Sequence, residues 1–139
     1  MKQLFFLLFF SSALLASCQQ SGAKNAPTEA LAAKANAPVI SEVLPLEAYK
    51  SKMNELGDGR QLIDVRTPEE YNEGHIEGAV NIDFYADDFE QQLQQKLDKG
   101  KPVLLYCRSG SRSAQSAEQM KALGFKEMYD LKGGFMAWK

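Results

Sequence analysis

Residues 103–106 are four consecutive apolar residues, and they lead directly into a short polar segment that begins with a cysteine. A short, uninterrupted apolar run is typical of a strand that is buried on both faces of a parallel sheet. The polar segment, residues 107–113, reads Cys, Arg, Ser, Gly, Ser, Arg, Ser. Apolar residues with helical spacing then follow at Ala114, Ala117, Met120 and Leu123. The region therefore predicts a buried strand, a tight loop and a helix, in that order.

Strand-like and helix-like segments alternate along the rest of residues 40–139. Strands are predicted at 40–44, 61–65, 79–82 and 103–106, and helices at 46–56 and 87–97, with a further helix beginning after Thr67. Thr67, Pro68 and Glu70 form the pattern of a capping box. This alternation predicts an α/β fold with a mainly parallel central sheet and helices on both faces. In that architecture ligands bind beyond the carboxyl ends of the strands, and Cys107 immediately follows one of them.

The loop that starts at Cys107 has the composition of an anion site. A helix N-terminus carries about half a positive charge and several backbone N–H groups without partners. Arg108 and Arg112 add permanent positive charges, and Gly110 allows successive amides to face inward as an anion nest. Because a helix terminus and neighbouring cations both lower the pKa of a cysteine, we expect Cys107 to be a thiolate near neutral pH.

A buried cysteine followed by a basic helix cap is the alternative interpretation, since free cysteine packs as a small hydrophobe. A structural cysteine gains nothing from two nearby guanidinium groups. The two arginines and the glycine in the following five positions therefore favour a reactive thiol.

Three separated segments resemble the single-domain rhodaneses, a family of sulfurtransferases. Residues 106–125 are similar to the active-site loop and following helix of that family, residues 62–82 to its upstream signature, and residues 131–138 to its C-terminal motif. The resemblance extends from about residue 40 to residue 139 and implies a rhodanese-like fold. It also implies that Cys107 accepts a sulfur atom as a persulfide and passes it to an acceptor such as cyanide or a thiol, with no cofactor.

A persulfide sulfur is small, polarisable and partly anionic, so it requires a ring of N–H donors. The residues expected to bind the persulfide and the substrate are Arg108, Ser109, Gly110, Ser111, Arg112 and Ser113. The sulfite that leaves a thiosulfate donor requires fixed cations, which the two arginines can supply. In the family that this chain resembles, basic loop residues accompany thiosulfate-like donors, so the resemblance implies a donor of that class.

Other classes of cysteine protein also fit parts of this pattern. Tyrosine and dual-specificity phosphatases place a thiolate and an arginine on a similar loop, but here the Cys107–Arg112 spacing is one residue shorter, and Tyr106 stands where most of them have histidine. A thiol-disulfide oxidoreductase would normally need a resolving cysteine, and the only other cysteine is Cys18. A non-catalytic binding or sensor module on the same fold stays open.

Several other residues are interpreted as structural. Asp64 and Arg66 end a predicted strand and are expected to support the site as an ion pair or loop brace. His75, the only histidine, is assigned to a turn because a preformed thiolate needs no general base. One histidine and one free cysteine do not make a ligand set, so no metal site is predicted. The remaining expectations are a final turn and aromatic anchor at Gly133, Gly134 and Trp138, and core positions for Tyr106, Phe125 and Phe135.

Residues 1–17 have the charged start and apolar middle of a secretory signal peptide. The apolar stretch is shorter than the ~20 residues that a membrane-spanning helix needs. Residues 15–18 resemble the lipobox of bacterial lipoproteins, which implies cleavage before Cys18 and acylation of that residue; an ordinary signal peptide is the alternative. Several acyl chains anchor a protein stably. Because Gln19 favours outer-membrane sorting, we expect a lipid-anchored protein of the bacterial cell envelope that faces the periplasm.

Residues 18–39 are expected to form the acylated cysteine and a flexible tether, since they are rich in Ala, Asn, Ser, Gly and Pro. Residues 40–139 are then long enough for one domain with one core. The formal net charge of −2 does not indicate the excess of basic residues that is typical of nucleic-acid-binding proteins. The predicted partners are a small-molecule sulfur donor, a thiol or cyanide acceptor and a membrane, with no nucleic acid; the sequence does not indicate the oligomeric state.

Overall fold

The computed structural model describes residues 38–139. The signal peptide expected at residues 1–17, the lipidation expected at Cys18 and residues 19–37 of the expected tether lie outside the described residues. Within residues 38–139, no helix combines the length and the apolar character that crossing a membrane requires.

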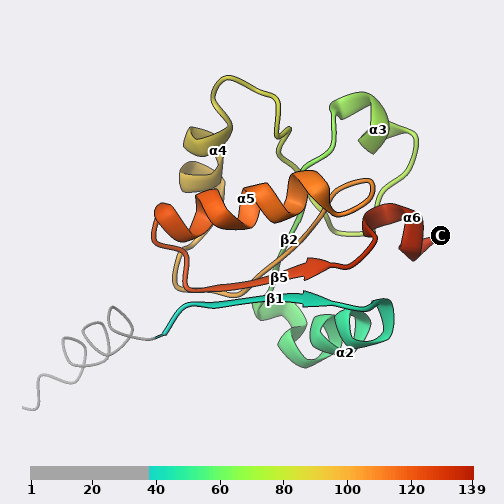
Figure 1. Ribbon diagram of the computed structural model, residues 1–139, viewed down its shortest axis with the longest axis horizontal. Helices are drawn as coiled ribbons and strands as arrows, with labels where there is room; N and C mark the ends of the chain where they lie inside the picture. The colour runs from blue at the N-terminus through green and yellow to red at the C-terminus, as the bar shows by residue number, and fades with distance from the viewer. Residues whose placement is uncertain (1–37) are drawn as a thin grey trace, which may run out of the picture.

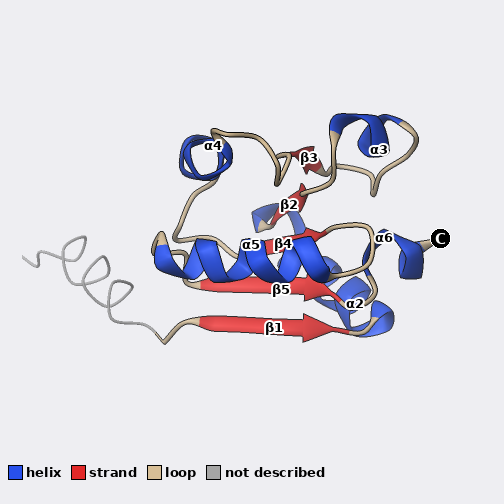
Figure 2. Ribbon diagram, turned by 45° about the horizontal axis from the view of Figure 1, so that its top comes forward, coloured by secondary structure: helices blue, strands red, loops and turns tan. Residues whose placement is uncertain are grey.

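Within residues 38–139, five parallel strands form one sheet (Figure 1), in the order β1-β5-β4-β2-β3 that the labels of Figure 2 show. Helices cover both faces of this sheet (Figure 2). In chain order the elements are β1 (Ile40–Leu44), α2 (Leu46–Leu56), the short 3-10 helix η1 (Gly57–Gly59), β2 (Gln61–Asp64), α3 (Pro68–Asn72), β3 (Val80–Asn81), α4 (Phe89–Lys96), β4 (Val103–Tyr106), α5 (Ser111–Ala122), β5 (Glu127–Leu131) and α6 (Gly134–Trp138). The predicted α/β fold with a parallel central sheet is confirmed.

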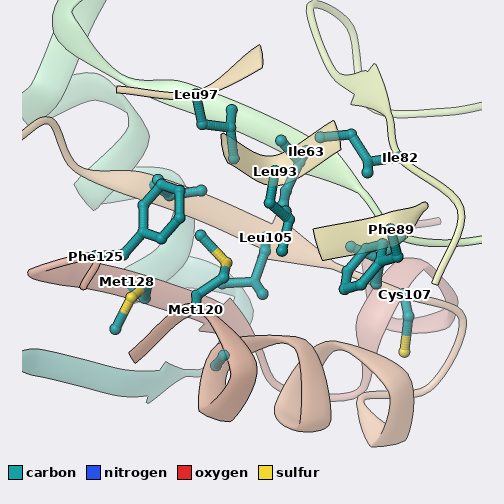
Figure 3. Close-up of a cluster of buried hydrophobic side chains, with 13 residues drawn as sticks. Ile63, Ile82, Phe89, Leu93, Leu97, Leu105, Cys107, Met120, Phe125 and Met128 are labelled. Atoms are coloured by element: carbon teal, nitrogen blue, oxygen red, sulfur yellow. The ribbon is translucent and has the colours of Figure 1, made fainter. Parts of the chain in front are cut away.

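The side chains of β4 alternate between two hydrophobic clusters, one on each face of the sheet. Val103 and Leu105 pack with residues of α4 and α5, in the cluster that Figure 3 shows. Leu104 and Tyr106 pack on the opposite face with residues of α2 and α6. Every side chain of β4 is fully buried, which explains its unbroken apolar sequence. The expected core residues Tyr106, Phe125 and Phe135 are all buried.

The N-terminus of α3 has the predicted capping box. The Glu70 amide donates to the Thr67 hydroxyl, the Thr67 amide donates to the Glu70 carboxylate, and Pro68 occupies the first turn. These two reciprocal bonds satisfy backbone donors that a helix otherwise leaves without partners. The start of α3 is therefore set by local sequence.

Some element boundaries differ from the prediction. β2 ends at Asp64, β3 covers only Val80–Asn81, and α4 begins at Phe89 rather than at residue 87. The late start of α4 follows from a turn, in which the Phe89 amide donates to the Ala86 carbonyl. β5 is an element that the apolar pattern alone does not predict.

The carboxyl ends of β2 and β4 lie next to each other. The two strands are paired in register, with Asp64 opposite Tyr106. The segments that follow them carry Arg66 and Cys107, so these residues emerge at the same edge of the sheet. This is the edge at which ligands bind in sheets of this type.

Candidate active site

Cys107 lies at the first position of the loop between β4 and α5. Its side chain is 1% exposed, and its sulfur points away from the other labelled side chains in Figure 3. The sulfur accepts a hydrogen bond from the Gly110 amide at 3.1 Å and another from the Ser113 hydroxyl at 3.5 Å. Gly110 has a φ of 105°, a conformation that residues with side chains rarely adopt. The loop thus surrounds the sulfur with N–H and O–H donors.

The pKa of Cys107 lies below the ordinary value of a cysteine. Burial raises it, but hydrogen bonds from the Ser113 hydroxyl and from the backbone amides of Ser113, Gly110 and Ser109 lower it more. The thiolate is the nucleophilic form of a cysteine. The direction agrees with the expectation from the sequence, whereas the main causes are uncharged donors of the loop rather than the arginines.

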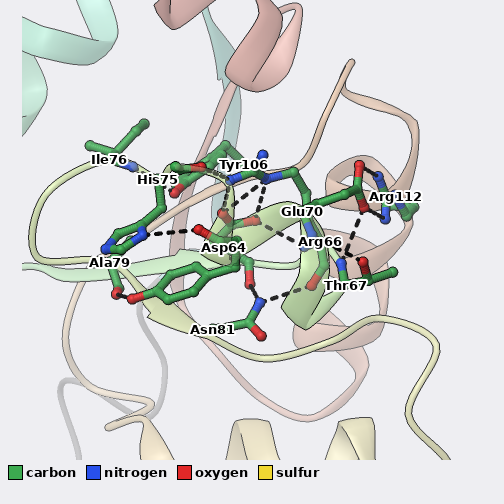
Figure 4. Close-up of polar contacts among 12 residues, drawn as sticks. Asp64, Arg66, Thr67, Glu70, His75, Ile76, Ala79, Asn81, Tyr106 and Arg112 are labelled. Carbon is green, nitrogen blue, oxygen red and sulfur yellow. Dashed lines mark hydrogen bonds and ion pairs between the residues drawn. The ribbon is translucent and has the colours of Figure 1, made fainter.

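The Arg112 guanidinium is bound to Glu70 of α3 and is not a free cation beside the sulfur. Hydrogen bonds of 2.7 and 2.9 Å join it to the two carboxylate oxygens (Figure 4). The bond with Glu70 is the largest effect that raises the pKa of Arg112, and the charge of Cys107 contributes further. Arg112 therefore acts on the sulfur at longer range, with its charge partly neutralised. The sequence analysis expects Arg112 as a permanent cation of the loop and names no partner for it; the structure adds Glu70 as that partner.

Arg108 is exposed and lines a cavity of about 260 Å³ beside the loop. The cavity is lined by Arg66, Glu70, Glu73, Arg108, Phe135, Met136 and Lys139. Among residues 38–139, Arg108 and Lys139 of this lining have no carboxylate partner, whereas Arg66 is paired with Asp64. The exposed residues Ser109 and Ser111 complete the outer side of the loop. Another cavity, of about 210 Å³, is lined by Gly57, Asp58, Arg60, Leu62 and Gly78 and includes no residue of the loop.

Asp64 and Arg66 form a buried ion pair at the end of β2. Arg66 Nη2 lies 2.6 Å from Asp64 Oδ2, and the two side chains are 5% and 0% exposed (Figure 4). The guanidinium also donates to the Gly74 carbonyl at 2.8 Å and lies 4.1 Å from the centroid of the Phe135 ring. The pair therefore joins β2 to the turn before β3 and to α6.

The start of α6 is attached to the Cys107 loop by two backbone hydrogen bonds. The Phe135 amide donates to the Cys107 carbonyl at 2.7 Å, and the Met136 amide donates to the Arg108 carbonyl at 3.1 Å. Gly134 allows this close approach, because a Cβ there would lie only 2.5–2.6 Å from backbone atoms of Cys107 and Arg108. The predicted final turn thus also holds the loop in place.

His75 lies outside the loop. It is exposed, and its ring stacks on Tyr71 with the ring centroids 3.8 Å apart. Within residues 38–139, no three His, Cys, Asp or Glu side chains are grouped so that they could hold a metal ion.

Two residues near the loop have roles that the sequence analysis does not assign to them. Glu70 is expected only as a helix cap, but it also binds Arg112. Asp130 of β5 is buried; burial raises its pKa to about 6, and the Ser113 hydroxyl opposes part of that effect. A carboxylate between the apolar residues Tyr129 and Leu131 is the one signal that could have indicated Asp130.

Comparison with known proteins identifies similar chains. The family model of the rhodanese-like domain matches residues 47–139. YqhL of Bacillus subtilis is 44% identical over 81 residues, which cover 56% of this chain and only 60% of that protein's length. A Coxiella burnetii protein named thiosulfate sulfurtransferase GlpE is 41% identical over 103 residues, covering 73% of this chain and 89% of that protein. The crystal structure of a rhodanese-like domain protein from Staphylococcus aureus has a TM-score of 0.62 and 30% identity, and the match covers 70% of this chain and 91% of that one.

Proposed function

Because this chain belongs to the rhodanese-like family, whose matched relatives include proteins named thiosulfate sulfurtransferase, we propose that it transfers sulfur through a persulfide on Cys107. The observation that carries this proposal is the state of the Cys107 sulfur. It is a free thiol with a lowered pKa, and it accepts hydrogen bonds from Gly110 and Ser113. These are the properties that a sulfur nucleophile requires.

The transfer consists of two displacement steps. In the first, the Cys107 thiolate attacks the outer sulfur of a thiosulfate-like donor, the donor S–S bond breaks, and sulfite leaves with the bonding electron pair. The product is a persulfide whose terminal sulfur carries the negative charge. In the second, cyanide or a thiolate attacks that terminal sulfur, the persulfide bond breaks, and thiocyanate or a new persulfide leaves. The Cys107 thiolate is then restored, so charge and electrons balance without a cofactor.

The loop supports both steps because each one begins and ends with negative charge on sulfur. The Gly110 amide and the Ser113 hydroxyl are oriented toward the sulfur before any donor arrives. The N-terminus of α5, directly after Gly110, adds its partial positive charge. Donors that are oriented in advance stabilise developing charge without further reorganisation.

Arg108 is the residue that we assign to the anionic donor. It is exposed and lines the cavity beside the loop, and its charge is not neutralised by an ion pair among the described residues. A permanent cation on the same loop as the thiolate favours the approach of a dianion such as thiosulfate and the departure of sulfite.

Intact-mass measurement tests the persulfide directly. The chain is weighed before and after treatment with thiosulfate, and again after cyanide. We expect a gain of one sulfur atom that cyanide removes as thiocyanate. Cys107→Ser is the control: it should abolish the gain and leave the domain folded. No gain with thiosulfate or any other sulfur donor, despite a reactive Cys107, would contradict the proposal and lead to a phosphate-ester assay and to the binding-module interpretation.

We also propose that the protein is held in the bacterial cell envelope by acyl chains on Cys18 and faces the periplasm. The basis is the sequence of residues 1–18 alone. Cys18→Ser should convert a form that partitions into detergent into a water-soluble form. Continued partition of the variant into detergent would contradict lipidation at this residue.

A further inference from the structure

The cavity beside the Cys107 loop contains a buried cation whose hydrogen-bonding capacity is only partly used. Arg66 lines this cavity and is 4% exposed. Its Nε and Nη2 atoms donate to the Asp64 carboxylate and to the Gly74 carbonyl, but none of its hydrogen bonds within residues 38–139 involves Nη1. A guanidinium carries five N–H donors in a fixed, planar arrangement. Arg66 therefore offers the cavity donors that the fold itself does not use.

Two further cations, Arg108 and Lys139, line the same cavity. Neither has a carboxylate partner in the described part of the chain. The Arg66 guanidinium and Lys139 Nζ lie 4.1 and 4.9 Å from the centroid of one ring, that of Phe135. Arg66 and Lys139 are therefore close neighbours, and together with Arg108 they provide a group of charged N–H donors suited to a carboxylate.

Glu73 adds the opposite charge to this lining. It is exposed and forms no ion pair among residues 38–139. Its chain neighbour Gly74 accepts a hydrogen bond of 2.8 Å from Arg66 Nη2, which places Glu73 beside that cation. A carboxylate repels a dianion such as thiosulfate but attracts an ammonium group. The lining therefore matches a ligand that carries both a carboxylate and an ammonium.

The cavity is also larger than thiosulfate requires. Its volume of about 260 Å³ corresponds to about nine water molecules at roughly 30 Å³ each. Thiosulfate consists of a single sulfur centre with three oxygens and one outer sulfur. The remaining space is sufficient for an amino acid with a short side chain.

The walls of the cavity are attached to the residue that carries the reactive sulfur. Arg108 directly follows Cys107 in the chain, and the Phe135 amide donates to the Cys107 carbonyl at 2.7 Å. The Met136 amide, from another lining residue, donates to the Arg108 carbonyl at 3.1 Å. A ligand in the cavity therefore lies against the Cys107 loop.

We propose that this cavity binds the carboxylate and the ammonium of an amino-acid thiol, the acceptor in the second displacement step. Arg66 Nη1, Arg108 and Lys139 bind the carboxylate, and Glu73 binds the ammonium. The thiolate of the bound acceptor attacks the outer sulfur of the persulfide, the bond to Cys107 Sγ breaks, and its electron pair stays on Cys107. The inference rests on the proposed function, since an acceptor has a role only if Cys107 carries a persulfide.

Three acceptors test the two charged groups separately. L-Cysteine carries both groups, cysteamine lacks the carboxylate, and 3-mercaptopropionate lacks the ammonium. The full-length chain carries Cys18→Ser, which leaves Cys107 as its single thiol. It is loaded with thiosulfate and separated from the excess, and the loss of its extra sulfur to each acceptor is followed by intact mass. The variants are Glu73→Gln and Lys139→Gln, both at exposed positions that the hydrophobic clusters do not include.

We expect Glu73→Gln to slow the transfer to cysteine and to cysteamine by about two- to five-fold, the range of a partly exposed ion pair. It should not slow the transfer to 3-mercaptopropionate. Lys139→Gln should slow the transfer to cysteine and to 3-mercaptopropionate by a similar factor and leave the transfer to cysteamine unchanged. Each comparison uses one acceptor, so differences between the thiols themselves cancel. Glu90→Gln and Lys96→Gln, at exposed positions of α4, are the matched controls and should change no rate.

Equal slowing with all three acceptors, or no slowing with any of them, overturns the proposal. A chain that takes up no sulfur loses the proposed sulfurtransferase function instead, and the cavity is then tested by calorimetry with S-methyl-L-cysteine, which has both charged groups but no thiol. Weaker binding to Glu73→Gln and Lys139→Gln than to the two control variants supports the site for the charged groups. Binding that is absent, or equal in all variants, overturns that site as well.

Discussion

At the scale of single residues, Asp130 makes the stability of the fold depend on pH. Burial raises its pKa from the 3.8 of an ordinary aspartate to about 6, so the folded state holds a proton that the unfolded chain releases. With more protons bound in the folded state, the free energy of unfolding falls as the pH rises through this window and remains lower above it.

Asp130→Asn removes this titration. At about 1.4 kcal/mol for each unit of pKa, we expect the variant to gain up to about 3 kcal/mol of stability above the Asp130 pKa and almost nothing below the ordinary aspartate value. Urea denaturation on each side of the window measures the difference. The same gain on both sides would mean that the carboxyl group does not titrate in the folded protein.

The residue scale also shows how far the sequence could predict the site. The Thr67–Glu70 capping box was predictable because both partners lie within one helical turn. The partner of Arg112 was not predictable, because Glu70 is 42 positions away and a fold is needed to bring them together. The donors to the sulfur, by contrast, belong to the loop and could be anticipated from it.

At the scale of elements, α6 and the Cys107 loop touch at Gly134. Gly134→Ala would place a Cβ 2.5–2.6 Å from backbone atoms of Cys107 and Arg108, so one segment must move. We expect Gly134→Ala to lower the free energy of unfolding by about 1–3 kcal/mol more than a substitution that causes backbone strain alone. Alkylation of Cys107 should also become slower, because the displaced loop no longer presents its donors to the sulfur. Thermal melting and iodoacetamide kinetics measure the two effects.

Gly124→Ala is the matched control for Gly134→Ala. Gly124 also has a positive φ, of 94°, but a Cβ there meets nothing within 4 Å. Backbone strain should lower the melting temperature of this variant, but the alkylation rate of Cys107 should stay unchanged. Equal slowing in both variants would mean that the contact at Gly134 does not hold the loop.

The Glu70–Arg112 ion pair joins α3 to α5. Its side chains are only 25% and 14% exposed, so solvent screens it incompletely. We expect Arg112→Ala to cost about 1 kcal/mol of stability and to reduce sulfur transfer more than this loss explains, because the cation nearest to the start of α5 is gone. Urea denaturation measures the stability, and the rate of thiocyanate formation measures the transfer. Glu70→Gln breaks the ion pair but keeps the charge of Arg112, so it separates the effect of the pair from the effect of the charge. A normal transfer rate in Arg112→Ala would exclude Arg112 from the transfer.

One element, β5, could not be recognised from its residues. The strand carries Met128, Tyr129 and Leu131 as buried apolar side chains, but Asp130 interrupts them. A prediction from the hydrophobic pattern places an aspartate at the surface, because aspartate side chains are exposed in most proteins. Asp130 is buried here because β5 lies between β1 and β4, an arrangement that only the folded chain supplies.

At the scale of the whole molecule, the fold class follows from the alternation of strands and helices, and the structure confirms it. The order of the strands does not follow from that alternation, since several parallel arrangements bury the same residues. The place of the site follows from the class, because residues after neighbouring strands meet at one edge of the sheet. For this reason Cys107 and Arg66 were predicted together, although nothing local links them.

The position of β5 in the sheet has a consequence for the growing polypeptide. β5 is the last strand in chain order, yet it lies between β1 and β4 and is the only pairing partner of β1 among the described strands. A nascent chain that stops before residue 127 therefore has its first strand and its central strand, but not the strand that joins them. Protease digestion of ribosome-arrested chains should find β1 open to cleavage until residues 127–131 have left the exit tunnel. The same C-terminal stretch carries Phe135 and Met136, whose amides hold the loop, so the thiol of Cys107 acquires its mature surroundings only when these last residues are free to fold.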